Sequence, residues 1–169
     1  MFSMPEGGTL FELASALVGE LRSAGRTVAT AESCTGGWIS KAITDVPGSS
    51  EVFAYGIVSY SNTAKEALLD VNAKTLEASG AVSAAVVEEM ARGVLKLSGA
   101  DIAVAVSGVA GPDGGSDEKP VGTVWFAWST SGAKGVTTDT EQKSFRGDRG
   151  AVRERTVIHA LRGVRERIF

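Results

Sequence analysis

Apolar residues recur at spacings of three and four in several segments, as expected for helices that bury one face. The first such segment opens with a T-x-x-E capping box at Thr9 and ends near Gly25. Later segments with the same periodicity follow residues that favour helix starts. These segments predict helices that begin near Trp38 and Asn72, helices capped by Asn62 and Ser83, and a last helix over 148–168.

Short apolar runs lie between these segments and predict strands. The runs over 27–31, 53–60 and 102–106 are apolar at odd and even positions alike, which is typical of strands covered on both faces. A further run over 121–128 precedes a turn and the Thr-rich, charged segment 136–144, which favours an exposed antiparallel edge strand. The pattern predicts an α/β fold, a three-layer α/β/α sandwich around a mixed, mostly parallel sheet of about five strands.

Composition adds bounds to this picture. The 169 residues fit one domain over 1–169, and 43% hydrophobic with 22% charged residues indicate a compact globular protein. No apolar run approaches the roughly 18 residues of a membrane span, and no secretory signal precedes the first helix. A single cysteine, Cys34, cannot form an internal disulfide. We therefore expect a cytoplasmic protein without a membrane partner.

Scarce and charged residues exclude further classes of function. One cysteine and one histidine, His159, cannot build a Cys/His zinc cluster or a multi-histidine site, whereas a carboxylate-rich Mg²⁺ site remains possible. The formal net charge of −3 argues against generic nucleic-acid binding. Positive charge nevertheless gathers over 146–169, with seven arginines against three acids. That segment is either a solvated helix face or an anion site.

A first candidate site follows the first predicted strand, in the segment E-S-C-T-G-G over 32–37. Open α/β sheets bind ligands at the carboxyl ends of their strands. Ser33 could act there as an acyl-transfer nucleophile, with backbone N–H groups from Thr35 to Gly37 facing the developing oxyanion. Alternatively, Ser33 or Thr35 only caps the next helix and the glycines only permit the turn. Cys34 is a second candidate nucleophile, although a buried structural cysteine is commoner.

A second candidate segment, Y-S-N-x-x-K over 60–65, follows the second predicted strand. A serine nucleophile needs a base, and the single histidine lies far along the chain, in the last predicted helix. Lys65 can serve instead if burial or nearby positive charge lowers its pKa from about 10.4 towards roughly 7–8. The alternative is a solvated lysine in the first turn of a helix.

A third candidate segment is the glycine-rich stretch over 107–115, after the third predicted strand. It lacks the G-K-[ST] ending of a Walker A loop and does not match G-x-G-x-x-G, so those nucleotide-binding motifs are excluded. Its glycines would let a phosphate or ribose approach the backbone closely. A long connecting loop explains the same residues equally well.

As an ordered set, these segments resemble the CinA C-terminal domain family, whose stand-alone members are nicotinamide-nucleotide amidases. The resemblance covers nearly the whole chain from about Leu10. The motifs that carry it are A-E-S-C-T-G-G over 31–37, Y-S-N-x-x-K over 60–65, G-A-V-S over 80–83, S-G-V-A-G-P-D-G-G over 107–115, K-P-V-G-T-V over 119–124 and G-D-R over 147–149.

The resemblance implies hydrolysis of nicotinamide mononucleotide to nicotinate mononucleotide and ammonia, in pyridine nucleotide recycling, without a metal or organic cofactor. It implies that Ser33 is the nucleophile, Lys65 the general base and Tyr60 a supporting residue, and it suggests a homo-oligomer. Arg146 departs from the small residue that the family favours before G-D-R, so the arginine that meets the phosphate stays open. We expect oxyanion or substrate contacts from Thr35, Gly36, Gly37, Ser107, Gly108, Gly111 and Arg149.

Two non-catalytic interpretations also stay open. The chain could be a nucleotide-binding module that uses the same glycine-rich segments without turnover. It could also be a competence- or DNA-damage-associated accessory module that binds nucleic acid through its arginine-rich end. The acidic remainder of the chain disfavours nucleic acid as a partner.

Overall fold

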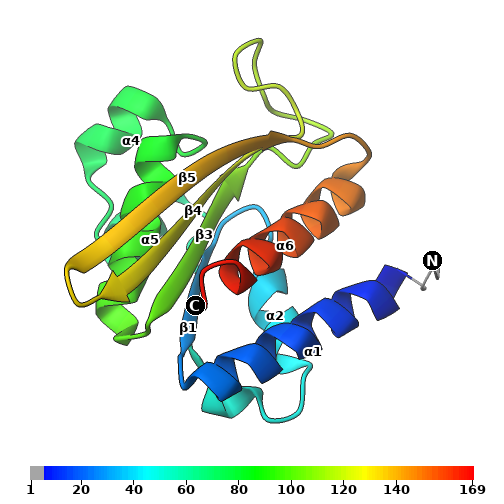
Figure 1. Cartoon of the computed structure of the whole chain (residues 1–169). Helices are drawn as coiled ribbons and strands as arrows, with labels where there is room; N and C mark the ends of the chain where they lie inside the picture. Colours follow the sequence, from blue (N-terminus) through cyan, green and yellow to red (C-terminus); the bar gives the residue numbers. More distant parts are fainter. Residues whose placement is uncertain (1–5) are drawn as a thin grey trace.

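The computed structural model describes residues 6–169 and has a five-stranded sheet at its centre (Figure 1). The strand order is β2-β1-β3-β4-β5, with the first three strands parallel and the last two antiparallel to their neighbours. The predicted mixed sheet is therefore confirmed. The strands are β1 (Val28–Glu32), β2 (Phe53–Val58), β3 (Ile102–Gly108), β4 (Thr123–Gly132) and β5 (Gly135–Ser144).

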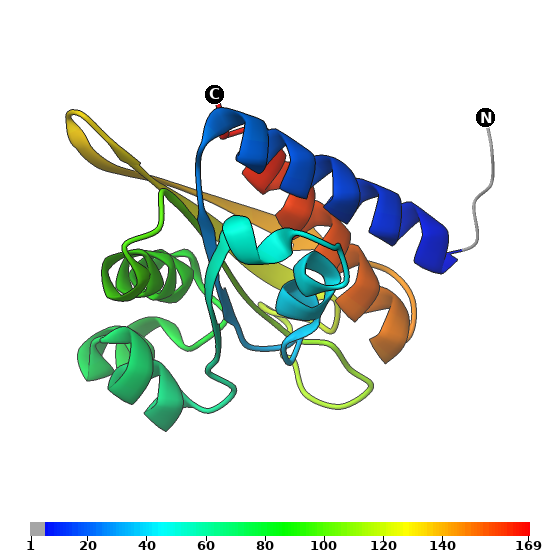
Figure 2. The ribbon, with the colours of Figure 1, turned by 90° about the horizontal axis from the view of Figure 1, so that it is seen from below.

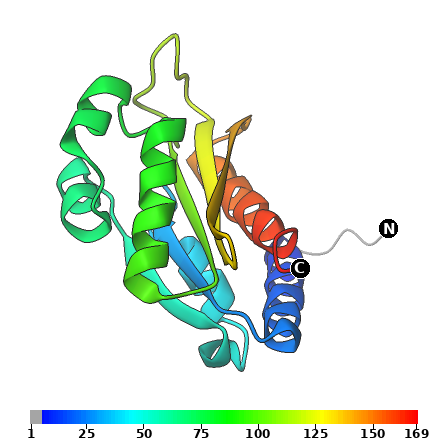
Figure 3. The same ribbon diagram turned by 60° about the vertical axis from the view of Figure 1, so that its left-hand side comes forward.

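Helices cover both faces of the sheet and complete the predicted three layers, which Figures 2 and 3 show from two further directions. A short 3₁₀ helix, Ser49–Glu51, precedes β2. One layer consists of α1 (Glu6–Ala24), α2 (Trp38–Thr44) and α6 (Arg149–Arg165), and the opposite layer of α3 (Asn62–Leu69), α4 (Ala73–Ser79) and α5 (Ala84–Ser98).

The central strand β3 separates two hydrophobic cores because its side chains alternate between the faces. Val104 and Val106 belong to the core under α1, α2 and α6. Ala103 and Ala105 belong to the core under α5, where small side chains let the helix approach the sheet closely. Burial on both faces explains why this strand reads as a continuous apolar run.

Three local predictions differ from the structure. The first helix already begins at Glu6, so a capping box at Thr9 is wrong. Strand β2 forms an edge of the sheet with Tyr55 and Val58 exposed, so its predicted coverage on both faces is wrong. The cap of α3 is Ser61, one residue before the predicted Asn62, because the Ser61 hydroxyl accepts from the Ala64 N–H at 3.0 Å. The predicted cap of α5, Ser83, is confirmed, and α4 begins directly after the expected Asn72.

The three parallel strands end at the same edge of the sheet, and this places the candidate segments together. Residues 33–37 follow β1, residues 59–61 follow β2, and residues 109–115 follow β3. β1 lies between the other two, so the segment after it has a neighbour on each side. Within residues 6–169, no helix is long and apolar enough to cross a membrane.

Candidate active site

Ser33 and Lys65 meet at this edge of the sheet. The Lys65 Nζ donates to the Ser33 Oγ at 2.9 Å. It also donates to two backbone carbonyls, at 2.8 Å to Ser59 and at 3.2 Å to Tyr60. Lys65 is only 1% exposed and Ser33 8% exposed, so the alternative of a solvated lysine is wrong.

The environment of Lys65 shifts its protonation equilibrium towards the neutral form. Burial lowers the pKa of the Lys65 ammonium below its ordinary value of 10.5, and the opposing influence of the nearby Cys34 is smaller. When the amine loses a proton, its lone pair can accept the hydrogen of a hydroxyl at the same 2.9 Å separation. The pair therefore has the arrangement of a nucleophile and its base.

Cys34 has the opposite character. Its side chain is buried, and burial raises the pKa of the thiol to about 12. Because the thiolate is the reactive form, a thiol with this pKa is a poor nucleophile near neutral pH. The geometry favours Ser33 over Cys34.

Glu32 organises the turn between β1 and α2. It lies in the first candidate segment, but no role is predicted for it from the sequence. Its buried carboxylate accepts from the Thr35 hydroxyl at 2.6 Å and from the Ile39 N–H at 2.8 Å. Its second oxygen accepts from the N–H and the hydroxyl of Ser40, at 3.0 and 2.9 Å. A carboxylate thus meets the open N–H groups at the start of α2, where neither Ser33 nor Thr35 serves as the cap.

The backbone N–H groups of the turn between β1 and α2 fall into two groups, one that is hydrogen-bonded within the turn and one that is not. The Gly36 N–H donates to the Ser33 carbonyl at 3.0 Å and so closes the turn. The N–H groups of Thr35 and Gly37 have no acceptor among residues 6–169. Gly36 and Gly37 adopt φ values of 59° and 99°, in the left-handed region that favours glycine.

Tyr60 connects the pair to Arg149. Its carbonyl accepts from Lys65, whereas its hydroxyl, on a side chain that is 59% exposed, accepts from Arg149 Nη2 at 3.1 Å. Arg149 Nη1 donates to the Gly111 carbonyl at 2.7 Å. Arg149, at the start of α6, thereby joins the segments after β2 and β3, while Arg146 lies exposed before the helix.

The remaining predicted residues lie on or after β3. Ser107 is buried next to Val106, whose carbonyl accepts from the Ser33 N–H at 3.2 Å. At Gly108 an added Cβ would lie 2.8 Å from the Thr123 carbonyl oxygen, so the close pairing of β3 with β4 already requires glycine there. Gly111 has a φ of 85°, which also favours glycine.

Arg153 is a second residue that sequence reasoning missed. From α6, its Nε donates to the Cys34 carbonyl and its Nη2 to the Thr35 carbonyl, both at 3.1 Å. The guanidinium also lies 5.6 Å from the ring centroid of Trp38. Its spacing of four residues from Arg149 was the available signal, since such residues share a helix face.

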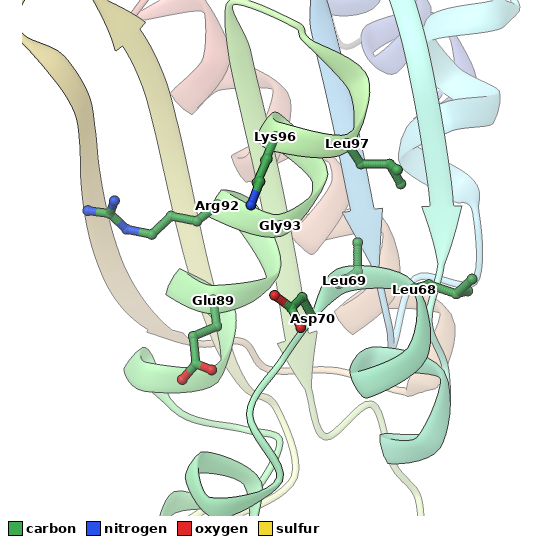
Figure 4. A pocket seen from close by; sticks show the side chains of 8 residues that line it. All are labelled: Leu68, Leu69, Asp70, Glu89, Arg92, Gly93, Lys96 and Leu97. Carbon is green, nitrogen blue, oxygen red and sulfur yellow. The ribbon is translucent and has the colours of Figure 1, made fainter.

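A pocket lies away from the Ser33 and Lys65 pair, between the end of α3 and α5 (Figure 4). It has a volume of about 570 Å³ and contains none of the predicted site residues. Leu68, Leu97, Arg92 and Glu89 are among its lining side chains. Within the described part of the chain, no three His, Cys, Asp or Glu side chains form a group that could hold a metal ion.

Comparisons with known proteins identify relatives of this chain. The family model of the CinA C-terminal domain matches residues 10–168. The nicotinamide-nucleotide amidohydrolase PncC of Escherichia coli K12 is 53% identical over 152 residues, which cover 90% of each chain.

Two solved structures share the fold. The competence damage-inducible protein A of Klebsiella pneumoniae superposes with a TM-score of 0.89 at 42% identity, covering 94% of this chain and 96% of that one. The competence/damage inducible protein CihA of Agrobacterium tumefaciens gives a TM-score of 0.88 at 41% identity, with 98% of both chains covered. The chain therefore belongs to the CinA C-terminal domain family.

Proposed function

We propose that this chain hydrolyses the carboxamide of nicotinamide mononucleotide to nicotinate mononucleotide and ammonia, as a step of pyridine nucleotide recycling. The observation that carries the proposal is the 2.9 Å hydrogen bond from a buried Lys65 amine to the Ser33 hydroxyl. Relatives named nicotinamide-nucleotide amidohydrolase, 53% identical over 90% of both chains, support the reaction and the substrate class.

In the proposed first half-reaction, neutral Lys65 takes the hydroxyl proton while the Ser33 Oγ attacks the carboxamide carbon. The N–H groups of Thr35 and Gly37 are free to donate to the resulting oxyanion. Lys65 then returns the proton to the leaving nitrogen, the C–N bond breaks, and ammonia leaves a nicotinoyl ester on Ser33. Water attacks this ester with Lys65 again as base, which releases the carboxylate and restores the serine.

The other end of the substrate carries a phosphate, for which Arg149 is the proposed partner. Its guanidinium lies beside the exposed Tyr60 hydroxyl at 3.1 Å, so both groups can donate to phosphate oxygens. Gly111 fixes the arginine through its carbonyl, and Ser107 lines the same edge of the sheet. The proposed steps transfer only protons and an acyl group, and they involve no metal or organic cofactor.

Ammonia release from nicotinamide mononucleotide, without added metal, tests the proposal. We expect release by the wild-type protein, a loss of about 10³-fold or more in Ser33→Ala, and near wild-type release in Cys34→Ala. Lys65→Ala should lose at least about 10²-fold. Calorimetric titration should show that Ser33→Ala still binds the nucleotide. A folded wild-type protein that binds the nucleotide without releasing ammonia would contradict the proposal and favour the nucleotide-binding module.

A further inference from the structure

Arg153 holds the turn that carries Ser33 from the side of α6. Its two hydrogen bonds end on consecutive carbonyls, those of Cys34 and Thr35, each at 3.1 Å. A planar guanidinium can make two such bonds from one rigid group, which a lysine ammonium cannot reproduce. Arg149, four residues earlier on the same helix, bonds to Tyr60 and Gly111 instead. The first turns of α6 thus contact both sides of the proposed site.

These carbonyl contacts determine where the neighbouring N–H groups point. The only cis peptide bond among residues 6–169 joins Gly111 and Pro112, so the bond between Cys34 and Thr35 is trans. In a planar trans peptide the N–H points opposite to the C=O. With the Cys34 carbonyl directed at Arg153, the Thr35 N–H is directed away from Arg153.

The next peptide plane is held both by Arg153 and by the turn itself. The Thr35 carbonyl accepts from Arg153 and from the Trp38 N–H, each at 3.1 Å, and the Gly36 N–H of that plane donates to the Ser33 carbonyl at 3.0 Å. The Thr35 N–H has no acceptor of its own among the described residues. The direction of the Thr35 N–H therefore depends on the Cys34 carbonyl, which belongs to the same peptide plane. That carbonyl accepts from Arg153.

The two glycines of the turn permit its peptide planes to rotate, so the contacts of Arg153 matter for their orientation. Gly36 and Gly37 both adopt left-handed φ values, and glycine restricts peptide-plane rotation less than other residues. The guanidinium packs directly on the turn, since a Cβ added at Gly36 would lie 3.3 Å from Arg153 Nη2. Stacking 5.6 Å from the Trp38 ring centroid holds the guanidinium there.

We infer that Arg153 is a positioning residue that orients the Thr35 N–H towards the oxyanion of the proposed reaction. It acts through the carbonyls of Cys34 and Thr35 and does not contact the substrate. Donors that are oriented before the reaction stabilise developing charge without reorganisation, so their effect belongs to the transition state. The inference rests on the proposed function, whose substrate it uses.

Steady-state kinetics of three variants test the inference. Arg153→Met keeps much of the length of the side chain and removes its donors, Arg153→Lys can reach one carbonyl at a time, and Arg162→Met removes an exposed charge from the same helix. Because small misplacements of catalytic groups cost about 10²-fold, we expect kcat to fall about 10- to 100-fold in Arg153→Met, with KM within about twofold. The kcat of Arg153→Lys should lie between those of the wild type and Arg153→Met, and the kcat of Arg162→Met should match that of the wild type.

Hydrogen exchange of a peptide covering residues 33–38 provides a readout that needs no turnover. In Arg153→Met we expect faster exchange of this peptide, because its two bonds to the turn are lost, and unchanged exchange in Arg162→Met. Unchanged exchange in Arg153→Met would overturn the inference whatever the activity. A several-fold rise in KM with unchanged kcat would also overturn it, because Arg153 would then bind substrate. If the wild type released no ammonia, the proposed function would fail and the oxyanion role of the Thr35 N–H would fail with it, whereas exchange would still decide whether Arg153 holds the turn.

Discussion

Lys65, at the end of the parallel strands, is buried, and His159, beneath the antiparallel strands, is partly buried with 24% of its side chain exposed; the two have different neighbours. Lys65 donates to the Ser33 hydroxyl and to two carbonyls. His159 packs edge-on against Phe126 and Trp128, with ring centroids 4.7 and 5.8 Å away. Burial lowers the pKa of each group below its ordinary value.

The comparison teaches that a lowered pKa does not by itself indicate a catalytic group. The neutral form of Lys65 faces a hydroxyl whose proton it can accept. The Nε2 of His159 lies 3.3 Å from a Glu141 oxygen without the geometry of a hydrogen bond to any group in residues 6–169. We therefore expect changes at Lys65 to affect turnover, and changes at His159 to affect the pH dependence of stability.

The largest expected effect is that of Lys65→Met. Without the amine, kcat for ammonia release should fall by about 10²- to 10⁴-fold, the usual contribution of a general base. Wild-type kcat should rise with pH as Lys65 loses its proton and level off above the pKa of Lys65, which lies below 10.5. Unfolding in urea should show that the variant remains folded.

A chemical substitution sharpens this test. Lys65→Cys, made together with Cys34→Ala and alkylated with bromoethylamine, carries an amine of similar length whose pKa is lower because of the sulfur. Restored turnover with a pH midpoint below that of the wild type would support a base at position 65. Restored turnover with the same pH midpoint as the wild type would contradict the role of residue 65 as the base.

The approach of Ser33 and Lys65 could be predicted because it follows from the topology of the sheet. Both residues follow parallel strands, and the carboxyl ends of such strands meet at one edge. The exposure of β2 could not be predicted, because its apolar composition matches that of a buried strand and its place at the edge depends on the order of the strands.

Glu32 and Arg153 were missed for a different reason. Their partners are largely backbone groups, the N–H groups of Ile39 and Ser40 and the carbonyls of Cys34 and Thr35. Almost every residue type has these groups, so no sequence pattern marks the partners. The spacing of Arg153 from Arg149 indicates a shared helix face, but only the fold shows which backbone groups the side chain reaches.

The intermediate effect is expected at Glu32, whose carboxylate supports the turn that carries Ser33, the partner of Lys65. Glu32→Gln replaces one accepting oxygen with an NH₂ group that faces donors, among them the N–H and hydroxyl of Ser40. An unsatisfied buried group costs about 1–3 kcal/mol, so urea unfolding should show a loss of that size. We also expect kcat to fall about tenfold because the Ser33 turn loses its support.

Glu88→Gln is the matched control for Glu32→Gln. Glu88 lies 3.3 Å from Arg92 on the surface of α5, with 45% of its side chain exposed. Surface ion pairs of this kind contribute roughly 0.2–1 kcal/mol, so both stability and kcat should stay close to the wild type. Equal losses in the two variants would show that the buried carboxylate has no special role.

The smallest effect is expected at His159 and concerns stability. Burial lowers its folded-state pKa, and the opposing attraction of Glu141 is weaker. The unfolded chain therefore binds a proton near pH 6.5 that the folded chain takes up only at lower pH. Stability should be constant above this pH and should fall below it until the folded-state pKa is reached, by at most about 1.4 kcal/mol per pH unit.

His159→Phe keeps an aromatic ring beside Phe126 and removes the titration. Urea unfolding of the wild type and the variant between about pH 5 and 8 should give a difference in unfolding free energy that is flat above about pH 6.5 and changes below it in favour of the variant. Turnover near neutral pH should match the wild type, because the histidine lies outside the Ser33 site. A pH-independent difference in stability would mean that His159 titrates alike in the folded and unfolded states. Lost turnover would contradict the functional distinction between Lys65 and His159.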